Sequence, residues 1–131
     1  MRNQTDWIRK PRQNKYANQK VELDGHKFDS KLEARRYAEL KLLEKAGEIK
    51  ELELQKPFVI QPSFFDTDGK RQTAIKYYAD FAYWEKQGDD WSYIVEDVKS
   101  PATKKDRVYR LKKKMMAYNG YVIREYPKEE K

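Results

Sequence analysis

Apolar and polar side chains alternate most regularly between residues 73 and 99, and this pattern predicts two long strands, 73–84 and 91–99. Residues 85–90 between them carry Gly88 and two aspartates, the turn chemistry of a β-hairpin. In the first strand one face is wholly apolar and the other mixed: Ile75, Tyr77, Ala79, Phe81 and Tyr83 against Lys76, Tyr78, Asp80, Ala82 and Trp84. We expect this hairpin to form the centre of a sheet.

Helical patterns lie on both sides of the hairpin. Residues 31–46 predict a helix that begins after Ser30 as N-cap, with Glu33 completing a capping box, and that ends at Gly47. After Pro101, Thr103 is the expected N-cap of a second helix, with Asp106 three residues later. This helix should run to about residue 118, with an apolar stripe formed by Val108, Leu111, Met115 and Tyr118.

Shorter elements complete the pattern. Residues 21–28 predict a small hairpin turning at Asp24-Gly25, and 49–54 a half-exposed strand. Pro57 should interrupt the chain before a short strand at 58–60, a loop at 62–71 follows, and 121–126 is the last strand. The order predicts one domain over residues 21–127, of the α/β (α+β) class, with a mixed central sheet flanked by two main helices. Residues 1–20 would be a flexible basic arm and 128–131 a polar tail.

Composition excludes several kinds of site. The 131 residues include no Cys, which excludes disulfides and thiolate metal sites and fits a reducing cytoplasm. A single His argues against a histidine-based zinc site or a Ser-His-Asp triad. Since no apolar run approaches the ~20 residues needed to span a bilayer, we expect no membrane partner and a cytoplasmic protein.

The net charge of +7 is concentrated in two stretches. Residues 1–20 hold six Lys or Arg against one Asp, and residues 104–114 hold seven against one. Such stretches suit a phosphate backbone, because neutralising phosphates releases counterions. A lysine-rich solvated helix would give the same cluster, so charge alone does not identify a ligand.

An acidic residue lies inside the first apolar strand, and an acid and a lysine end the second. Asp97 and Lys99 are two apart and share a face, whereas Glu96 faces the opposite way and is expected to be structural. Buried carboxylates are costly unless they are paired or bind a metal. The alternative is an edge hairpin whose charges face water, against which the aromatic residues around Asp80 argue.

The pattern of Asp80 followed by Asp97-Val98-Lys99 resembles the signature of the PD-(D/E)XK nuclease superfamily. Residues 24–36 and 52–58 resemble segments of its small phage-encoded members, and the resemblance covers residues 15–126. Two departures are that Ala79, not Pro, precedes the first acid, and that the second acid is Asp rather than Glu. The resemblance implies a restriction-endonuclease-like core.

The resemblance also implies a metal site. Asp80 and Asp97, joined by the carbonyl of Val98, would hold Mg²⁺, for which Mn²⁺ could substitute, and no organic cofactor is expected. Glu33 would be a third acid that binds a water or a second metal, although its capping role is a structural alternative. Lys99 would orient the attacking water and stabilise charge in the transition state. Gln55 could approach this site, but an ordinary polar role is the stronger interpretation.

The expected activity is metal-dependent hydrolysis of DNA phosphodiester bonds. The backbone would be held by the basic arm and the second helix, through Arg9, Lys10, Arg12, Lys104, Lys105, Arg107, Arg110, Lys112, Lys113 and Lys114. Since no sequence-reading motif is present, we expect selectivity for DNA structure rather than for sequence. A Holliday-junction resolvase acting in phage DNA recombination is the leading specific expectation; it implies a homodimer and, for a phage protein, the cytoplasm of the host.

Two other classes of protein remain open. A catalytically silent nucleic-acid-binding module would keep the basic helix but would need no buried acids. A phage interaction or inhibitor protein would use Trp7 and the loop with Phe64 and Phe65, and its activity would be indifferent to Asp80→Ala.

Overall fold

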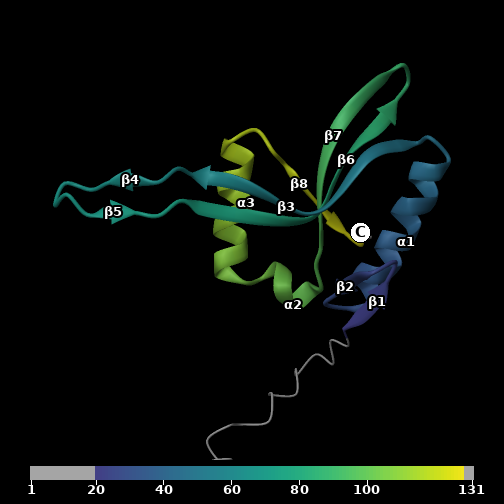
Figure 1. Cartoon of the computed structure of the whole chain (residues 1–131), viewed down its shortest axis with the longest axis horizontal. Coiled ribbons are helices and arrows are strands. Elements are labelled where there is room, and N and C mark those ends of the chain that lie inside the picture. Colours follow the sequence, from purple (N-terminus) through teal and green to yellow (C-terminus); the bar gives the residue numbers. More distant parts are fainter. Residues whose placement is uncertain (1–19, 129–131) are drawn as a thin grey trace, which may run out of the picture. The chain divides into compact units, whose positions relative to one another are not determined.

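A computed structural model describes residues 20–128, which fall into two compact units (Figure 1). The division lies inside the first helix, between Arg35 and Arg36, and each unit is described by itself. Among residues 20–128, no helix has the length and apolar character required to cross a membrane.

The N-terminal unit contains the predicted small hairpin. Strands β1 (Val21–Leu23) and β2 (His26–Phe28) pair antiparallel. The two turn residues, Asp24 and Gly25, have φ values of 52° and 77°. Both lie in the left-handed region that a two-residue type I′ turn requires, which is why an Asp-Gly pair occupies them. The prediction of a hairpin at this place is confirmed.

Helix α1 (Lys31–Lys45) begins in this unit and continues into the second one. At its start the Ser30 hydroxyl accepts a hydrogen bond of 3.1 Å from the Glu33 amide, as an N-cap does. At its end Gly47 has φ of 81°, and the Glu48 amide donates to the Leu43 carbonyl at 2.9 Å. This is a glycine-based C-terminal cap. Both predicted ends of the helix are confirmed to within a residue.

The second unit is built on a four-stranded sheet in the order β3-β6-β7-β8. Its strands are β3 (Ile49–Gln61), β6 (Ile75–Gln87), β7 (Asp90–Val98) and β8 (Ile123–Tyr126). The first three are antiparallel neighbours, whereas β8 lies parallel to β7. The protein is therefore a mixed α+β protein with a mixed central sheet, as predicted. The central hairpin is longer than expected because its turn shrinks to Gly88 and Asp89.

Pro57 does not interrupt β3, so the prediction of two separate strands is wrong. Proline cannot donate a ladder hydrogen bond, and this excludes it from central strands. Because β3 is an edge strand with β6 as its one neighbour in the sheet, its other side needs no donor, and Pro57 pairs in register with Tyr78.

The predicted loop at 62–71 contains strand structure. Strands β4 (Phe64–Phe65) and β5 (Arg71–Gln72) form a two-stranded ribbon that extends β3 and β6 away from the sheet (Figure 1). One carboxylate organises the turn: Asp66 accepts hydrogen bonds from the amides of Asp68 and Lys70 and from the side chain of Gln72. The two phenylalanines are exposed.

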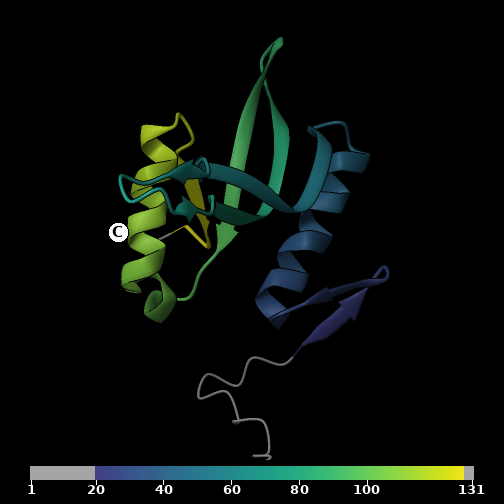
Figure 2. The same cartoon turned by 60° about the vertical axis from the view of Figure 1, so that its left-hand side comes forward.

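The connection from β7 to β8 holds two helices where one was predicted. Helix α2 (Pro101–Lys104) is capped by Ser100, and α3 (Arg107–Tyr118) is capped by Asp106, whose carboxylate accepts from the Tyr109 amide at 3.0 Å. Thr103 is therefore not the N-cap. Figures 1 and 2 show α3 on one side of the sheet and the later turns of α1 on the other.

Of the predicted apolar stripe of α3, Met115 packs against the core, and the other three residues do not face it. Val108, Leu111 and Tyr118 are 60%, 61% and 92% exposed, whereas Tyr109 and Met116 are buried. The latter two pack in a cluster with residues of the sheet: Ile60, Tyr77, Ala79, Val95 and Ile123. The sheet thus selects the helix face whose long side chains fill the space beside β6 and β7.

Candidate active site

Four polar side chains occupy adjacent positions across the four strands of the sheet. The register around Gln55 on β3 places it opposite Asp80 on β6, and Asp97 on β7 is paired with Glu125 on β8. The backbone amide of Asp80 donates to Asp97 Oδ1 at 2.9 Å, which joins the two halves of the row. Residues far apart in the chain therefore meet in one line across the sheet.

The two aspartates hold the point at which β6 and β7 separate. Paired residues of the two strands end at Phe81 and Glu96. One residue further, the Asp80 amide donates to the Asp97 carboxylate and the Val98 amide donates to Asp80 Oδ2, each at 2.9 Å. Carboxylates thus accept the backbone N–H groups that a continuing ladder would have used.

Gln55 completes this arrangement from the edge strand. Its side-chain amide donates to Asp80 Oδ1 at 3.1 Å, so both oxygens of Asp80 accept hydrogen bonds. Its φ of 49° lies in the left-handed region, which is unusual for a residue other than glycine. Such backbone strain often accompanies functional sites. The expectation that Gln55 could approach the site is confirmed by this hydrogen bond, and a functional role for it stays a prediction.

Asp97 is buried, with 1% of its surface exposed. Its Oδ2 has no hydrogen-bond partner among the residues that the structure describes. Burial raises the pKa of Asp97 to about 6, and the charge of Glu125 also raises it, whereas the positive charge of Lys99 and the Asp80 amide oppose the rise. A buried carboxylate oxygen without a donor is chemically suited to a hard cation.

Lys99 lies beside an aromatic support on α3. Its ammonium is 4.6 Å from the centre of the Tyr109 ring, a cation–π distance. The Tyr109 hydroxyl donates to Glu125 at 2.7 Å, and Lys113 forms an ion pair with the same carboxylate at 3.3 Å. Burial opposes ionisation of Glu125, but the bonds from Tyr109 and Lys113 prevail and lower its pKa. Sequence reasoning missed Tyr109 and Glu125, because only the strand register and the packing of α3 connect them to Asp97.

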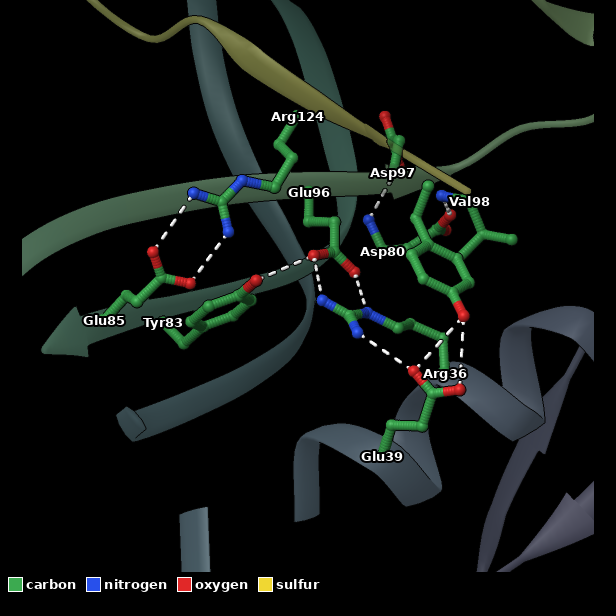
Figure 3. A network of polar contacts seen from close by, with 10 residues as sticks. Arg36, Glu39, Asp80, Tyr83, Glu85, Glu96, Asp97, Val98 and Arg124 are labelled. Carbon is green, nitrogen blue, oxygen red and sulfur yellow. Dashed lines mark hydrogen bonds and ion pairs between the residues drawn. The ribbon is translucent and has the colours of Figure 1, made fainter. Parts of the chain in front are cut away.

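The neighbouring acid, Glu96, points to the opposite side of β7 (Figure 3). It is fully buried and accepts two bonds from the Arg36 guanidinium, at 2.7 and 2.8 Å, and one from the Tyr83 hydroxyl at 2.7 Å. Both oxygens of this carboxylate therefore accept hydrogen bonds within the fold. The network has the character of a structural anchor between α1 and the sheet.

The structure brings together Asp80, Asp97, Val98 and Lys99 in the second unit. The contact of Val98 is made by its amide, and a ligand role for its carbonyl stays a prediction. Glu33 lies in the N-terminal unit, is buried, and has its amide capped by Ser30. Its role as a third acid therefore stays a prediction as well.

Of the predicted phosphate-binding residues, Arg9, Lys10 and Arg12 lie outside the described residues, as does Trp7. Two lysines of α3 are engaged with the body of the protein. Lys112 donates to the Lys76 carbonyl at 3.2 Å, and Lys113 pairs with Glu125. Lys105, Arg107, Arg110 and Lys114 are exposed, and Lys104 is half-buried.

A basic groove passes beside the row of polar residues. It consists of two adjoining hollows, of about 580 and 470 Å³, that share Lys104 and Glu125 in their walls. Beyond these two, the basic residues in the walls are Arg36, Arg124 and Lys128 in the first hollow and Arg110, Lys113 and Lys114 in the second. Because Glu125 pairs with Asp97 across β7 and β8, the groove begins one strand away from the aspartate pair. Arg124 and Lys128 had not been predicted as part of the basic surface.

The carboxylate pair fits a magnesium-like ion better than a metal held by protein ligands alone. Among residues 20–128, no group of three or more His, Cys, Asp or Glu side chains is placed to hold a metal. Mg²⁺ commonly takes one or two carboxylates and keeps several waters. Two carboxylates, one with a buried unbonded oxygen, match that demand.

The fold and site together define a mixed α+β protein with a buried and a half-buried aspartate and a lysine at the end of its central hairpin. The model of the family described as "Protein of unknown function (DUF1064)" matches residues 13–128, so the chain belongs to this family. Curated proteins and solved structures give no match to the chain.

Proposed function

We propose that this protein is a divalent-metal-dependent endonuclease that hydrolyses DNA phosphodiester bonds on a restriction-endonuclease-like core. The observation that carries the proposal is the aspartate pair. Asp80 and Asp97 are joined through backbone amides, and Asp97 keeps one buried oxygen without a donor. A purely structural carboxylate in that position would have acquired a partner, as Glu96 has.

Asp80 and Asp97 would hold the ion, with the Val98 carbonyl as a further ligand and Mg²⁺ or Mn²⁺ as the metal. When bound, the ion supplies Lewis acidity towards the scissile phosphate and lowers the pKa of a water. Gln55 fixes the carboxylate of Asp80 through its hydrogen bond of 3.1 Å. Glu33 is a candidate for binding a water or a second metal.

Lys99 places a positive charge close to the carboxylate pair, since its charge acts on Asp97. The ring of Tyr109 supports the ammonium, and Tyr109 is itself held by Glu125. In this position Lys99 would orient the attacking water and stabilise negative charge that develops on the phosphate. The lysine would therefore act on the transition state, with the Tyr109 ring beside its ammonium.

The DNA backbone would follow the basic groove from Lys104 towards Arg110 and Lys114 on one side and Arg124 and Lys128 on the other. Such contacts supply affinity and position but carry no sequence information. We therefore propose selectivity for DNA structure, with branched DNA as the substrate class. A Holliday-junction resolvase is the specific form of this proposal, and it requires a homodimer because two strands must be cut symmetrically.

The test is cleavage of linear duplex, single-stranded, flapped and four-way-junction DNA by the full chain with Mg²⁺, Mn²⁺ or EDTA. Metal-dependent cutting concentrated on the junction and lost in Asp80→Ala would support a structure-selective resolvase. Equal cutting of all substrates would leave a nuclease and overturn the resolvase. Binding without cutting under every condition would overturn the nuclease in favour of a silent DNA-binding module.

A further inference from the structure

A second concave site, separate from the aspartate pair, lies on the side of the sheet that α3 covers. It is an open cleft of about 580 Å³ between β3, the β6–β7 hairpin and the end of α3. Its walls are unusually aromatic, and the residues that matter here are Phe58, Trp84, Tyr93 and Tyr121, with Lys56 and Asn119 among the other lining residues. None of the sequence motifs predicted it.

The aromatic rings form a connected wall with accessible surface. Phe58 and Tyr121 have ring centres 5.0 Å apart, Trp84 and Tyr93 also 5.0 Å, and Tyr93 and Tyr121 6.2 Å. Phe58, Trp84 and Tyr93 are half-buried, and Tyr121 is 37% exposed. The rings pack against one another at tilted angles and still leave surface towards the cleft.

Polar groups in the walls match a planar heterocycle rather than an aliphatic side chain. The Asn119 amide nitrogen donates to the carbonyls of Met115 and Ile60, at 2.8 and 3.4 Å, so the oxygen of this side chain is left as the acceptor. Each nucleobase carries N–H donors on its Watson–Crick edge. Lys56 also lines the cleft, and its ammonium is paired with Glu53 at 2.8 Å.

The cleft is within reach of a strand that passes the aspartate pair. Tyr109, which supports Lys99, and Met116, which lines the cleft, belong to the same core cluster on α3. They are seven residues apart, about 10 Å along a helix. A DNA strand advances about 3.4 Å per nucleotide, so about three nucleotides cover this distance.

We propose that this cleft binds an unpaired nucleobase of the DNA substrate by stacking on Tyr121 and Phe58. The inference rests on the proposed nucleic-acid substrate and deepens it: a bound base would select DNA with unpaired nucleotides near the scissile phosphate. Base-on-aromatic stacking tolerates every base, because each has a π face. Selection would therefore be for unpaired structure and not for sequence.

The experiment measures binding in EDTA, so that it does not depend on cleavage. The probes are a single-stranded oligonucleotide, a duplex with a one-base bulge and a fully paired duplex, each carrying 2-aminopurine at one position scanned along the DNA. With the unaltered protein, the proposal expects quenching of 2-aminopurine at one unpaired position and none at any paired position. Absence of quenching at every position of the bulged and single-stranded probes would overturn it.

Variants locate the stacking residue. Tyr121→Leu should abolish the quenching and weaken binding of the bulged and single-stranded probes by about 5- to 150-fold, without affecting the fully paired duplex. Tyr121→Phe should restore both. The matched control is Tyr118→Leu. Tyr118 is three residues from Tyr121, is 92% exposed and is not one of the residues that line the cleft. Phe58→Leu provides a second test from the opposite wall.

Unchanged quenching in Tyr121→Leu and Phe58→Leu would overturn the assignment of the cleft, as would an equal loss on the fully paired duplex. Loss of quenching in Tyr118→Leu as well would place stacking on α3 instead of in the cleft and also overturn it. Displacement of a bound apolar dye by peptides but not by DNA would indicate a protein ligand instead. Failure of the nuclease proposal would appear separately, as an absence of metal-dependent cutting while quenching persists.

Discussion

Glu96 and Asp97 are adjacent acidic residues on β7, almost equally buried, at 0% and 1% exposure, and opposite in their surroundings (Figure 3). Glu96 accepts three strong bonds from Arg36 and Tyr83. Asp97 accepts one from the Asp80 amide and keeps an oxygen without a donor in the described part of the chain. Burial therefore does not distinguish these two acids, whereas the completeness of their hydrogen bonding does.

The difference follows from the two faces of a strand. Successive residues point to opposite sides of the sheet. Glu96 meets α1, whose Arg36 supplies a planar two-pronged donor, while Asp97 meets the position where β6 and β7 separate. The first environment compensates a buried charge completely. The second leaves one oxygen of the buried carboxylate without a donor among the residues that the structure describes.

The largest expected effect is on cleavage. Asp97→Ala and Asp80→Ala should each reduce the rate of metal-dependent DNA cleavage by at least about 10³-fold, because metal-assisted stabilisation is worth several kcal/mol. DNA affinity should change little. Single-turnover cleavage, with binding measured in parallel, provides the check. Normal cutting by either variant would show that the site is assigned wrongly.

The next effect is on stability and concerns Glu96. Arg36→Met should lower the free energy of unfolding by about 3–5 kcal/mol, because it leaves a buried carboxylate without its cation. Replacing both partners, as in Arg36→Met with Glu96→Leu, should recover much of this loss. Urea unfolding measures all three proteins. A cost below about 1 kcal/mol for Arg36→Met would mean that the network is not an anchor.

Removing the charge of Asp97 should have the opposite effect and raise the free energy of unfolding. Its pKa of about 6 in the folded protein lies above the unfolded value of about 3.9. Its destabilising effect is therefore absent below about pH 4, grows as pH rises and is complete above pH 6. In EDTA at pH 8, Asp97→Asn should stabilise the protein by up to about 3 kcal/mol, and the gain should vanish near pH 4.

Glu96→Gln is the matched control for that measurement. It removes the charge of a carboxylate that is already paired, so it should destabilise the protein at pH 8 where Asp97→Asn stabilises it. Unfolding curves of both variants across pH 4–8 decide the matter. If both variants change the free energy of unfolding at pH 8 in the same direction, the contrast drawn between Glu96 and Asp97 is wrong.

The smallest effect is on the salt dependence of DNA binding. Arg110→Ala with Lys114→Ala removes two exposed charges from the groove. The slope of log affinity against log salt, which is negative, should become shallower by about 2. Lys112→Ala with Lys113→Ala removes charges engaged with Lys76 and Glu125 and should change the slope less. Titrations at several salt concentrations compare the pairs. Equal slopes would indicate that the contacts of Lys112 and Lys113 give way to DNA.

Local features were predictable. The hairpin at Asp24-Gly25 and both ends of α1 follow from turn and cap chemistry, which involves only neighbouring residues. That Asp80 and Asp97 lie close together was expected from the family resemblance, and the hydrogen bond of the Asp80 amide to Asp97 confirms their proximity. The buried face of α3 was not predictable in the same way: its sequence holds two apolar sets, and the one chosen, with Tyr109 and Met116, depends on which fits the sheet.

By itself, the sequence determined the central hairpin, its two aspartates and the basic character of α3. Only the tertiary structure decided that Gln55 and Glu125 lie in one row with them, that Arg36 compensates Glu96, and that four aromatic rings line a cleft. The physical reason is the separation in sequence between the residues that determine each feature. Caps, turns and alternation depend on residues a few positions apart, whereas strand register and helix placement depend on packing between distant segments, which no local pattern encodes.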